Sequence, residues 1–508
     1  MATTTQEPAG VARARMMLQR ARWAASAFAG YDRERVLRIA SAVTEAASAR
    51  AAHYAEWAVR ETGFGVVEHK RLKNELCSRG IFEHYRDEDL VSARLDPERK
   101  IVEIPRPAGV IFALTPSTNP VSTVYFKVIL ALLTRNAIVI SPHPMARECC
   151  TDAARWLADA AERAGAPDGA VQVVEQPSIP LIEALMADER TNVILATGGT
   201  AVVRAAYRSG NPALGVGPGN GPVLVDATAD PAKAAQRIVD SKSFDNSVLC
   251  TNESVLIAET GVADPLLEQM RRQGAHLCTP EERDRLRNYL FPEGHFRVAA
   301  VGKDAAWIAR ECGITVPTGT RVLLAPFDLA VPEEPLAHEK LCPVLGLVQV
   351  PDAKRGIDVS RAVLRITGAG HSAAIHSNDP ATIMAFAAAV NVLRVSVNAG
   401  SSTGSAGFDT NLAPSMTIGT GYLGRSSVGE NLRPHHLVDV MRVAYNSDPA
   451  EPFGDFTGLQ PWTALPGRAA APAQSPAAGG AAEETLMAEL REEIRRLVLE
   501  ELQQLNRR

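Results

Sequence analysis

The chain of 508 residues and 54.3 kDa is longer than one compact core usually is, and its length predicts about two to four domains. Hydrophobic residues make up 46% and charged residues 22%, which is typical of a soluble globular protein and excludes a largely disordered chain. The 53 basic and 58 acidic side chains leave a net charge of −5, so no excess of positive charge favours nucleic acid or an anionic membrane as a partner.

Three features predict a cytoplasmic protein with reduced thiols. No apolar run approaches the ~18 residues that span a bilayer, and one of the longest, residues 126–133, ends at Thr134. The N-terminal residues lack the apolar stretch of a secretory signal. Seven cysteines, an odd number, do not suggest a disulfide framework.

The first hundred residues predict helices. Val36, Ile39, Ala40 and Val43 recur at helical spacing, and Asp32 is a suitable N-cap before them.

From about residue 101 the pattern changes to short β-rich runs that alternate with helical segments. The runs lie at 101–104, 109–114, 137–141, 170–174, 192–196 and 222–225. Helix candidates between them begin near Pro120, Met145, Ile179, Thr200 and Pro231. Strands that are almost continuously apolar and flanked by helices predict a parallel sheet covered on both faces. Such sheets bind ligands at the carboxyl ends of their strands.

A second α/β block is predicted from about residue 234 to 398. It begins with a helix and continues with β-rich stretches at 254–258, 321–327 and 344–350. Residues 398–407 are small and polar and predict a loop.

The C-terminal residues differ in kind from the rest. Ala, Pro and Gly fill 16 of the 22 positions from 461 to 482, which predicts a linker. Residues 483–508 predict an amphipathic helix, with Glu492 and Arg496 at favourable spacing on its polar face and Leu499 as the one exception to its apolar stripe. Such a helix has no local core, so its apolar face is expected to dock elsewhere.

Six segments, taken together and in order, resemble the CoA-acylating branch of the aldehyde dehydrogenase superfamily. They are LTPSTNPVS (114–122), SPHPMA (141–146), ATGGTAVVRAAYRSGNPALGVGPGNGP (196–222), SFDNSVLC (243–250), HEKLCPV (338–344) and GAGHSAAIHS (368–377). The chain is similar to CoA-dependent acetaldehyde, propionaldehyde and sulfoacetaldehyde dehydrogenases over about residues 30 to 450. An ordered set of this length is far more specific than a single motif.

The resemblance implies an α/β, aldehyde dehydrogenase-like fold with a Rossmann-like cofactor domain, an α/β catalytic domain and a β-rich bridging element. We expect N-terminal helices and an NAD/CoA-binding domain at 1–235, the catalytic domain at 236–425 and a C-terminal return and oligomerisation segment at 426–460. The linker at 461–482 and the helix at 483–508 complete the chain. A homodimer or homotetramer is expected.

Cys250 matches the nucleophile of the family. The resemblance implies that its thiolate attacks the aldehyde carbonyl to give a thiohemiacetal, and that hydride transfer to the nicotinamide leaves a thioester. Asn119 matches the side-chain amide that holds the oxyanion together with the Cys250 backbone N–H, and one such donor typically contributes about 10²–10³ in rate. From residue type alone, a lone cysteine is more often a small buried hydrophobic residue than a nucleophile. For Asn119 the alternative role is that of a helix cap, which it can combine with the role of oxyanion donor.

A catalytic residue of hydrolytic relatives is missing. The segment ALGVGPGNGP places Val216 where those relatives carry a glutamate that activates water against the thioester. Without that base the thioester is expected to persist until CoA attacks, so the expected reaction converts a short aldehyde to its acyl-CoA. Two alternatives stay open: a hydrolytic NAD(P)-dependent enzyme in which another carboxylate is the base, and a non-catalytic scaffold that recruits partners through its C-terminal helix.

The resemblance also assigns residues to cofactor binding. They are Thr115, Pro116, Ser117, Ser141, Pro142, His143, Gly198, Gly199, Gly217 and, for the nicotinamide ribose, Glu339. The expected cofactor is NAD. NADP stays open, because the chain has SPHP and GGTAVV where many relatives have a KPSE-like segment and GxTxxG. For Glu339 the alternative is a surface charge.

His371, a GxGxxG segment and the metal-binding motifs remain to be interpreted. His371 is expected to position CoA or relay a proton, or else to cap a turn. The GxGxxG at Gly419, Gly421 and Gly424 lacks a clear preceding strand and is not expected to bind phosphate. The sequence has no HExxH and no CxxC pair, so no metal site is predicted.

The C-terminal linker and helix resemble the encapsulation peptides of enzymes packed in bacterial microcompartments. The resemblance implies shell proteins as partners of residues 483–508, and a place inside such a compartment, where a volatile and reactive aldehyde would be confined. The alternatives are a coiled coil or an intramolecular helix. Membrane-surface binding is disfavoured because the polar face mixes Glu with Arg.

Overall fold

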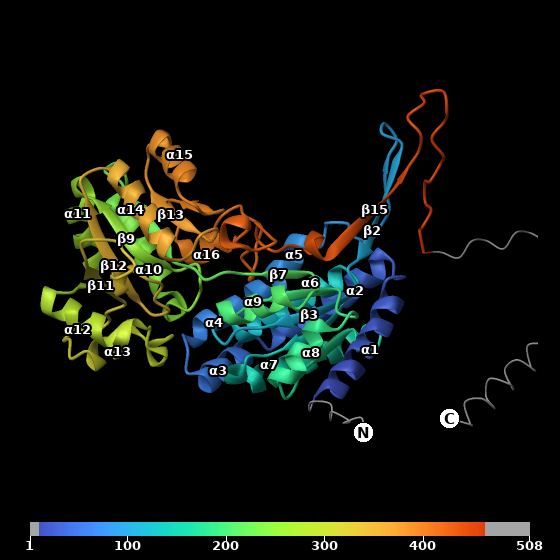
Figure 1. The fold of residues 1–508 in the computed structure, drawn as a ribbon, viewed down its shortest axis with the longest axis horizontal. Coiled ribbons are helices and arrows are strands. Elements are labelled where there is room, and N and C mark those ends of the chain that lie inside the picture. The colour runs from blue at the N-terminus through green and yellow to red at the C-terminus, as the bar shows by residue number, and fades with distance from the viewer. Residues whose placement is uncertain (1–9, 463–508) are drawn as a thin grey trace, which may run out of the picture. The chain divides into compact units, whose positions relative to one another are not determined.

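Three β-sheets organise the protein, and a computed structural model describes them within residues 10–462. Residues 10–458 belong to one compact unit, whose three sheets and their helices are drawn in Figure 1. The predicted amphipathic helix (483–508), and the predicted linker after residue 462, lie outside the described residues. Within the described part, no helix is long and apolar enough to cross a membrane.

The first hundred residues are largely helical, as predicted. The helices are α1 (Val11–Phe28), α2 (Arg33–Ala49), α3 (Ala51–Thr62), α4 (Val67–Glu75) and α5 (Ile81–Tyr85), with a π-helical turn at Leu76–Gly80. Asp32 caps α2 by accepting a hydrogen bond from the Arg35 N–H. Val36, Ile39 and Val43 are buried on one face of this helix, so the helical spacing in the sequence identified its inner side.

The five-stranded sheet is parallel throughout, in the order β5-β4-β3-β6-β7. Its strands are β3 (Val110–Leu114), β4 (Ala137–Ser141), β5 (Val171–Val173), β6 (Val193–Ala196) and β7 (Ala213–Gly215). The helices that follow β3, β4, β5 and β6 are α6 (Pro120–Leu133), α7 (Arg147–Arg163), α8 (Ile179–Ala187) and α9 (Thr200–Arg208). Every residue of β3 and β4 is buried, which explains their continuous apolar sequences.

Four predicted helix starts are confirmed to the residue. Helices α6, α8 and α9 begin at Pro120, Ile179 and Thr200, and α10 (Pro231–Ser243) begins at Pro231. Proline suits the first helical position because its missing N–H would have no partner there. Helix α7 begins at Arg147, after a 3-10 turn at Pro144–Ala146.

The seven-stranded sheet is also parallel, in the order β10-β11-β12-β9-β8-β13-β14. Its strands are β8 (Gly221–Val225), β9 (Glu253–Glu259), β10 (Ala275–Leu277), β11 (Val322–Pro326), β12 (Val344–Val350), β13 (Ala373–His376) and β14 (Val395–Val397). Its helices are α10, α11 (Thr260–Arg272), α12 (Pro280–Leu290), α13 (Ala305–Glu311), α14 (Ala353–Ile366) and α15 (Pro380–Ala389).

Two apolar cores lie on the two faces of this sheet. Val223 and Val225 of β8 belong to the core formed with α10 and α11, whereas Leu224 belongs to the core formed with α12, α13, α14 and α15. Successive strand residues point to opposite faces, so a strand covered by helices on both sides is apolar at every position.

Two predicted strand assignments were wrong. The run at 222–225, expected among the strands of the first sheet, is β8 of the seven-stranded sheet, where it pairs with β9 and β13. The run at 101–104 belongs to β2 (Ile101–Pro107), which is antiparallel. Sheet membership depends on long-range pairing, which local sequence texture does not encode. The expected domain limit at residue 235 falls inside α10.

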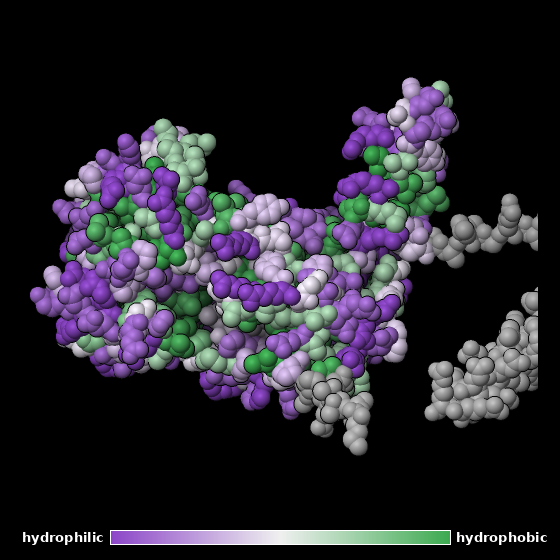
Figure 2. Space-filling view, viewed as in Figure 1, coloured by the Kyte–Doolittle hydropathy of each residue, from purple (hydrophilic) through white to green (hydrophobic). Residues whose placement is uncertain are grey.

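The three-stranded sheet forms an arm from distant parts of the chain. Strand β2 lies between β1 (Arg94–Asp96) and β15 (Val438–Ala444), both antiparallel to it. Figure 1 shows this arm standing away from the helices that surround the five-stranded sheet. Apolar side chains are exposed along it, including Met441 and Val443 on β15, as the green atoms on the arm in Figure 2 illustrate.

The predicted loop at 398–407 contains a short helix, α16 (Ser401–Ser405), so the expectation of a loop was only partly correct. Ser401 and Ser402 are held there by hydrogen bonds to the buried Glu253 and Ser241. The GxGxxG segment ends in a single 3-10 turn, Tyr422–Gly424, and no α-helix begins there. It therefore lacks the strand–turn–helix context of a phosphate loop.

Candidate active site

Cys250, the predicted nucleophile, lies on one of four loops that enter neighbouring strands of the seven-stranded sheet, and the loops of Glu339 and His371 are two of the others. Gly219 precedes β8, Cys250 precedes β9, Glu339 precedes β12 and His371 precedes β13. These strands stand side by side in the order β12-β9-β8-β13. Because all four are parallel, their amino ends meet at one edge of the sheet, and the loops before them gather there. The catalytic segments thus use the amino edge of this sheet, where the general expectation was a carboxyl edge.

Cys250, Gly219 and Glu339 are in direct contact. The Gly219 N–H donates a hydrogen bond to the Glu339 carboxylate. A Cβ added to Gly219 would lie 1.9 Å from the Cys250 carbonyl oxygen and 3.2 Å from Glu339 Oε1. Only glycine leaves room for this approach, so Gly219, which the sequence analysis did not identify, joins the nucleophile segment to the carboxylate.

The surroundings of Cys250 keep its thiol protonated. Burial and the nearby Glu339 carboxylate raise the pKa of Cys250 to about 12, whereas its own backbone N–H and the Arg394 guanidinium lower it. The other six cysteines are buried, and burial in apolar surroundings makes a thiol inert. Cys250 is partly exposed and is therefore the cysteine that a substrate can reach.

Glu339 is partly buried, and its surroundings both raise and lower the pKa of its carboxyl group. Burial raises the pKa of Glu339 to about 7, and the Lys242 ammonium and the Gly219 N–H oppose that rise. A solvated surface carboxylate would not have such an environment, so the alternative interpretation of Glu339 as a surface charge is not supported. A carboxylate of this kind can accept hydrogen bonds from ligand hydroxyls at the mouth of the site.

Asn119 is the N-cap residue of α6, but its side chain forms no cap hydrogen bond. It therefore occupies the predicted cap position without the side-chain hydrogen bond that is typical of an N-cap. Its Oδ1 instead accepts a hydrogen bond of 2.6 Å from Lys73 Nζ on α4, and its backbone carbonyl accepts the Thr123 N–H. The amide nitrogen makes one long contact, of 3.3 Å to the Thr118 hydroxyl.

The loop that leads to Cys250 has an unusual backbone. Asp245, Asn246 and Ser247 all have positive φ, at 48°, 51° and 62°. Left-handed conformations at residues other than glycine cost of order 1–3 kcal/mol each and gather at functional sites. Asp245 is fully buried and accepts hydrogen bonds from Lys70, Lys73 and the Val66 N–H, which hold the loop in place.

The predicted cofactor segments meet at the carboxyl edge of the five-stranded sheet. They follow the neighbouring strands β4, β3 and β6. The Thr115 N–H donates to the Ser141 carbonyl oxygen, which ties the first two segments together. The residues brought to this edge are Thr115, Pro116, Ser117, Ser141, Pro142, His143, Gly198 and Gly199.

Two features of this edge suit a phosphorylated, hydroxyl-rich ligand. The Thr115 hydroxyl is buried without a hydrogen-bond partner. Gly199 is the N-cap of α9, and a Cβ added there would meet no atom within 4 Å, so the helix N-terminus is open. His143, in contrast, accepts a hydrogen bond from the Met145 N–H in a local turn.

A cavity of about 430 Å³ lies between α9, the segment after β7 and the Gly419–Gly424 segment. Three arginines that the sequence analysis did not single out line it: Arg204, Arg208 and Arg425. Val216 and Gly217 contribute to its wall. The cavity is therefore lined both by positively charged side chains and by Val216, the residue that stands where hydrolytic relatives carry the glutamate.

His371 is a buried, neutral imidazole. Its Nδ1 lies 2.9 Å from the Ser372 hydroxyl, and its Nε2 is buried without a partner. Burial, with the neighbouring Arg394, lowers the pKa of His371 to about 3. Arg394 donates hydrogen bonds to the carbonyl oxygens of His371 and Gly370, so this loop is fixed from behind.

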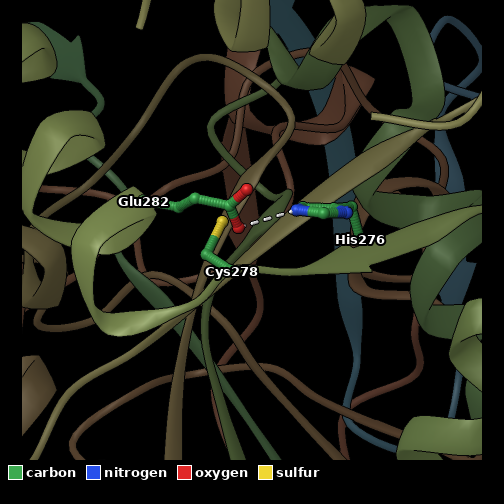
Figure 3. A group of neighbouring side chains, drawn as sticks. All are labelled: His276, Cys278 and Glu282. Atoms are coloured by element: carbon green, nitrogen blue, oxygen red, sulfur yellow. Dashed lines mark hydrogen bonds and ion pairs between the residues drawn. The ribbon is translucent and has the colours of Figure 1, made fainter. Parts of the chain in front are cut away.

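Outside this site, His276, Cys278 and Glu282 bring ligand-type atoms within 4.8 Å of one another. Figure 3 shows the hydrogen bond between His276 Nε2 and Glu282, 3.0 Å long, with Cys278 beside it. Glu282 also accepts the Thr279 N–H in a capping box at the start of α12. The hydrogen bond and the cap account for the polar groups of His276 and Glu282, a cluster that HExxH and CxxC patterns do not describe.

Comparison with known proteins identifies relatives over most of the chain. Residues 2–292 match the model of the aldehyde dehydrogenase family. The bifunctional aldehyde-alcohol dehydrogenase AdhE of Escherichia coli is 35% identical over 86% of this chain, which spans only 50% of that relative's length. The acetylating succinate-semialdehyde dehydrogenase of Clostridium kluyveri is 34% identical over 84% of this chain and 95% of its own.

Solved structures share the fold. An acetylating aldehyde dehydrogenase from Geobacillus thermoglucosidasius is 36% identical with a TM-score of 0.85, covering 86% of this chain and 97% of that one. The propionaldehyde dehydrogenase of Rhodopseudomonas palustris, solved with bound CoA and an acylated cysteine, is 28% identical with a TM-score of 0.78, covering 85% and 97%. A propionaldehyde dehydrogenase from a Clostridium phytofermentans microcompartment is 29% identical with a TM-score of 0.77, covering 85% and 97%. The chain belongs to the aldehyde dehydrogenase family.

Proposed function

We propose that the protein oxidises a short-chain aldehyde to its acyl-CoA, with NAD as the hydride acceptor and CoA as the acyl acceptor. The observation that carries this proposal is the site itself: a reachable Cys250 joined through Gly219 to Glu339, with Val216 where a hydrolytic base would stand. Acetylating relatives and a structure with CoA and an acylated cysteine support it.

The first chemical step forms a carbon–sulfur bond. Cys250 Sγ attacks the aldehyde carbon and loses its proton, which leaves a thiohemiacetal. Asn119 Nδ2–H and the Cys250 backbone N–H stabilise the negative charge that develops on oxygen. A nicotinamide held at the cofactor edge would supply the hydride acceptor, and loss of hydride from carbon and of the hydroxyl proton would leave a thioester on Cys250.

The second half of the reaction transfers the acyl group. The CoA thiolate attacks the thioester carbon, the acyl–CoA bond forms, and Cys250 leaves as a thiolate that takes up a proton. Val216 offers no carboxylate to activate water, so hydrolysis does not compete. The sum is aldehyde, NAD⁺ and CoA giving acyl-CoA, NADH and one proton.

The cofactor edge supplies groups that fit the dinucleotide. Thr115 and Ser141 offer hydroxyls, Gly199 opens the N-terminus of α9, and Glu339 would accept hydrogen bonds from ribose hydroxyls. The arginines of the neighbouring cavity supply charge for the phosphates of CoA or the dinucleotide. The same assay run with NADP measures the preference between the two cofactors.

Mass spectrometry of the intact protein tests the proposed chemistry. Aldehyde and NAD without CoA should add one acyl group to the wild type, and CoA should then remove it as acyl-CoA. Cys250→Ala should never acquire the adduct. An adduct on Cys250→Ala, or wild-type protein that releases free acid without CoA, would overturn the proposal.

We also propose that the protein is cargo of a bacterial microcompartment, addressed by residues 483–508. The sequence pattern of that segment supports this, as does the microcompartment origin of one structural relative. A variant lacking residues 461–508 should keep its kinetics and lose co-localisation with shell proteins. Unchanged co-localisation would refute the cargo role.

A homodimer or homotetramer built through the arm is a further part of this proposal. Strand β15 is an edge strand with exposed Met441 and Val443, and such an edge can pair with another copy of the chain. Light scattering after gel filtration should give a dimer or tetramer mass. A monomer would contradict it.

A further inference from the structure

A buried cluster of charges links α4 to the loop that carries Cys250. Lys70 Nζ lies 3.0 Å from Asp245 Oδ2, and Lys73 Nζ contacts the same oxygen. The two lysine side chains are 4% and 2% exposed and the Asp245 side chain is 0% exposed. Two ammonium groups and one carboxylate are thus enclosed together, with one more positive than negative charge.

Stability alone does not explain such a cluster. Enclosing an ion pair costs about as much desolvation energy as the pair regains, and a second cation adds to that cost. Burial lowers the pKa of Lys73 to about 8, in spite of the neighbouring Asp245. A group held at this cost is a candidate for a functional role.

Lys73 makes a second contact that suggests the role. Its Nζ donates a hydrogen bond of 2.6 Å to Asn119 Oδ1, the side-chain oxygen of the expected oxyanion donor. An ammonium group has donors and no acceptor, so the amide must present its oxygen to Lys73 and keep its N–H groups for another partner. Without Lys73 the amide could flip and present its oxygen to the substrate.

The same lysine also contacts Asp245, in the loop that precedes Cys250, but other groups hold this loop as well. Asp245, Asn246 and Ser247 hold the left-handed conformation that directs the chain toward Cys250. A Cβ added to Gly65 would lie 2.1 Å from Asp245 Oδ1, so Gly65 makes room for the carboxylate. The Asp245 N–H donates to His69 Nδ1, 2.8 Å away, which fixes the loop from α4 as well.

We propose that Lys73 is a positioning residue of the oxyanion site: it orients the Asn119 amide, whereas the Asp245 carboxylate that it also contacts is held by Lys70 and the Val66 N–H as well. The inference rests on the proposed function, because it assigns Lys73 to the oxyanion site of that reaction. A cation hydrogen-bonded to the amide oxygen also polarises the amide and makes its N–H a stronger donor.

A double-mutant cycle tests this role. Asn119→Ala should lower kcat about 10²–10³-fold, and Lys73→Met about 10–10²-fold. If Lys73 acts mainly through Asn119, the double variant should be no more than about threefold slower than Asn119→Ala. If the loss of kcat in the double variant instead equals the product of the losses in the two single variants, the inference is overturned.

Lys70→Met is the matched control. Lys70 binds the same Asp245 oxygen, but its other contact is the Thr118 carbonyl oxygen, 3.0 Å away, and not the Asn119 amide. Its loss of kcat should be smaller than that of Lys73→Met and should multiply with the loss from Asn119→Ala. If Lys70→Met behaves like Lys73→Met, the effect comes from removing any positive charge beside Asp245. That result would overturn the specific role of the Lys73–Asn119 hydrogen bond.

Alkylation of Cys250 by iodoacetamide provides a readout that needs no oxyanion donor. Its rate in Lys73→Met should stay within about threefold of wild type, and a loss equal to the loss of kcat would show a displaced loop and contradict the proposal. Lys73→Leu, which also removes the donors, carries the same cycle if Lys73→Met does not fold. A wild type without CoA-dependent turnover would refute the proposed function itself, whereas normal wild-type turnover with multiplying losses refutes only the role of Lys73.

Discussion

Cys250 is expected to be a weak nucleophile until substrate and cofactor are bound. Its pKa of about 12 means that only a small fraction is thiolate at neutral pH, and that fraction rises tenfold with each pH unit below the pKa. In the free protein, the rate of iodoacetamide alkylation at Cys250 should therefore rise about tenfold per unit from pH 7 to 9. Cys250→Ala supplies the background from the other thiols. A rate that levels off below pH 8 would show a thiolate stabilised in the free protein.

Val216 is the residue that separates acyl transfer from hydrolysis in this account. Val216→Glu places a carboxylate in a buried position beside the cavity, where its pKa is raised and it can act as a general base. Release of free acid without CoA should increase by about 10²-fold or more. Val216→Gln, of equal size and without a basic group, is the control. Equal hydrolysis by the two variants would show that the missing carboxylate does not decide the outcome.

Resemblance identified the residues proposed to act on the substrate, but not those behind them. Cys250, Glu339 and His371 were recognisable because they occur in ordered sequence motifs. Lys73 was not, because α4 has the sequence VEHKRLKNE, which is typical of a solvated helix. The available signal was the spacing of Lys70, Lys73 and Asn74, which lie on one helical face and are all buried.

At the scale of elements, α6 contains a buried ammonium that makes stability depend on pH. Lys127 donates to the carbonyl oxygens of Leu114 and Leu195, at the ends of β3 and β6. Burial lowers its pKa to about 7, from 10.5. Between these values the unfolded chain binds more protons than the folded one, so this group makes the protein more stable as pH rises.

Comparison with Lys127→Met isolates this effect. The free energy of unfolding of wild type minus that of Lys127→Met should increase from about pH 7 to pH 10, by up to about 1.4 kcal/mol per unit. Urea denaturation at several pH values measures it. Parallel pH curves for the two proteins would mean that Lys127 keeps an ordinary pKa in the folded state.

Element boundaries could be predicted better than element partners. Pro120 and Pro231 mark helix starts through their own covalent geometry, which is local information. The pairing of β8 with β13 joins residues about 150 positions apart, and β2 with β15 more than 300, and no local pattern contains such contacts. The sequence therefore indicated the α/β class, whereas the division of strands among three sheets required the structure.

At the scale of the whole molecule, the proposed reaction uses two opposite sheet edges. The carboxyl edge of the five-stranded sheet gathers the cofactor segments, and the amino edge of the seven-stranded sheet gathers Cys250, Glu339 and His371. Asn119 follows β3 of the five-stranded sheet and is linked, through Lys73, to Asp245 in the loop before β9 of the seven-stranded sheet. The proposed nucleophile and its proposed oxyanion donor thus come from loops of different sheets, so the proposed chemistry depends on both.

The central claim is acyl transfer to CoA, and NADH formation measured with and without CoA tests it most directly. Acetaldehyde, propionaldehyde and sulfoacetaldehyde are each assayed with wild-type protein, and the product is identified as thioester or free acid. At least one aldehyde should be turned over in a reaction that requires CoA and yields its acyl-CoA. Steady turnover to free acid without CoA, or no turnover of any aldehyde under either condition, would contradict it.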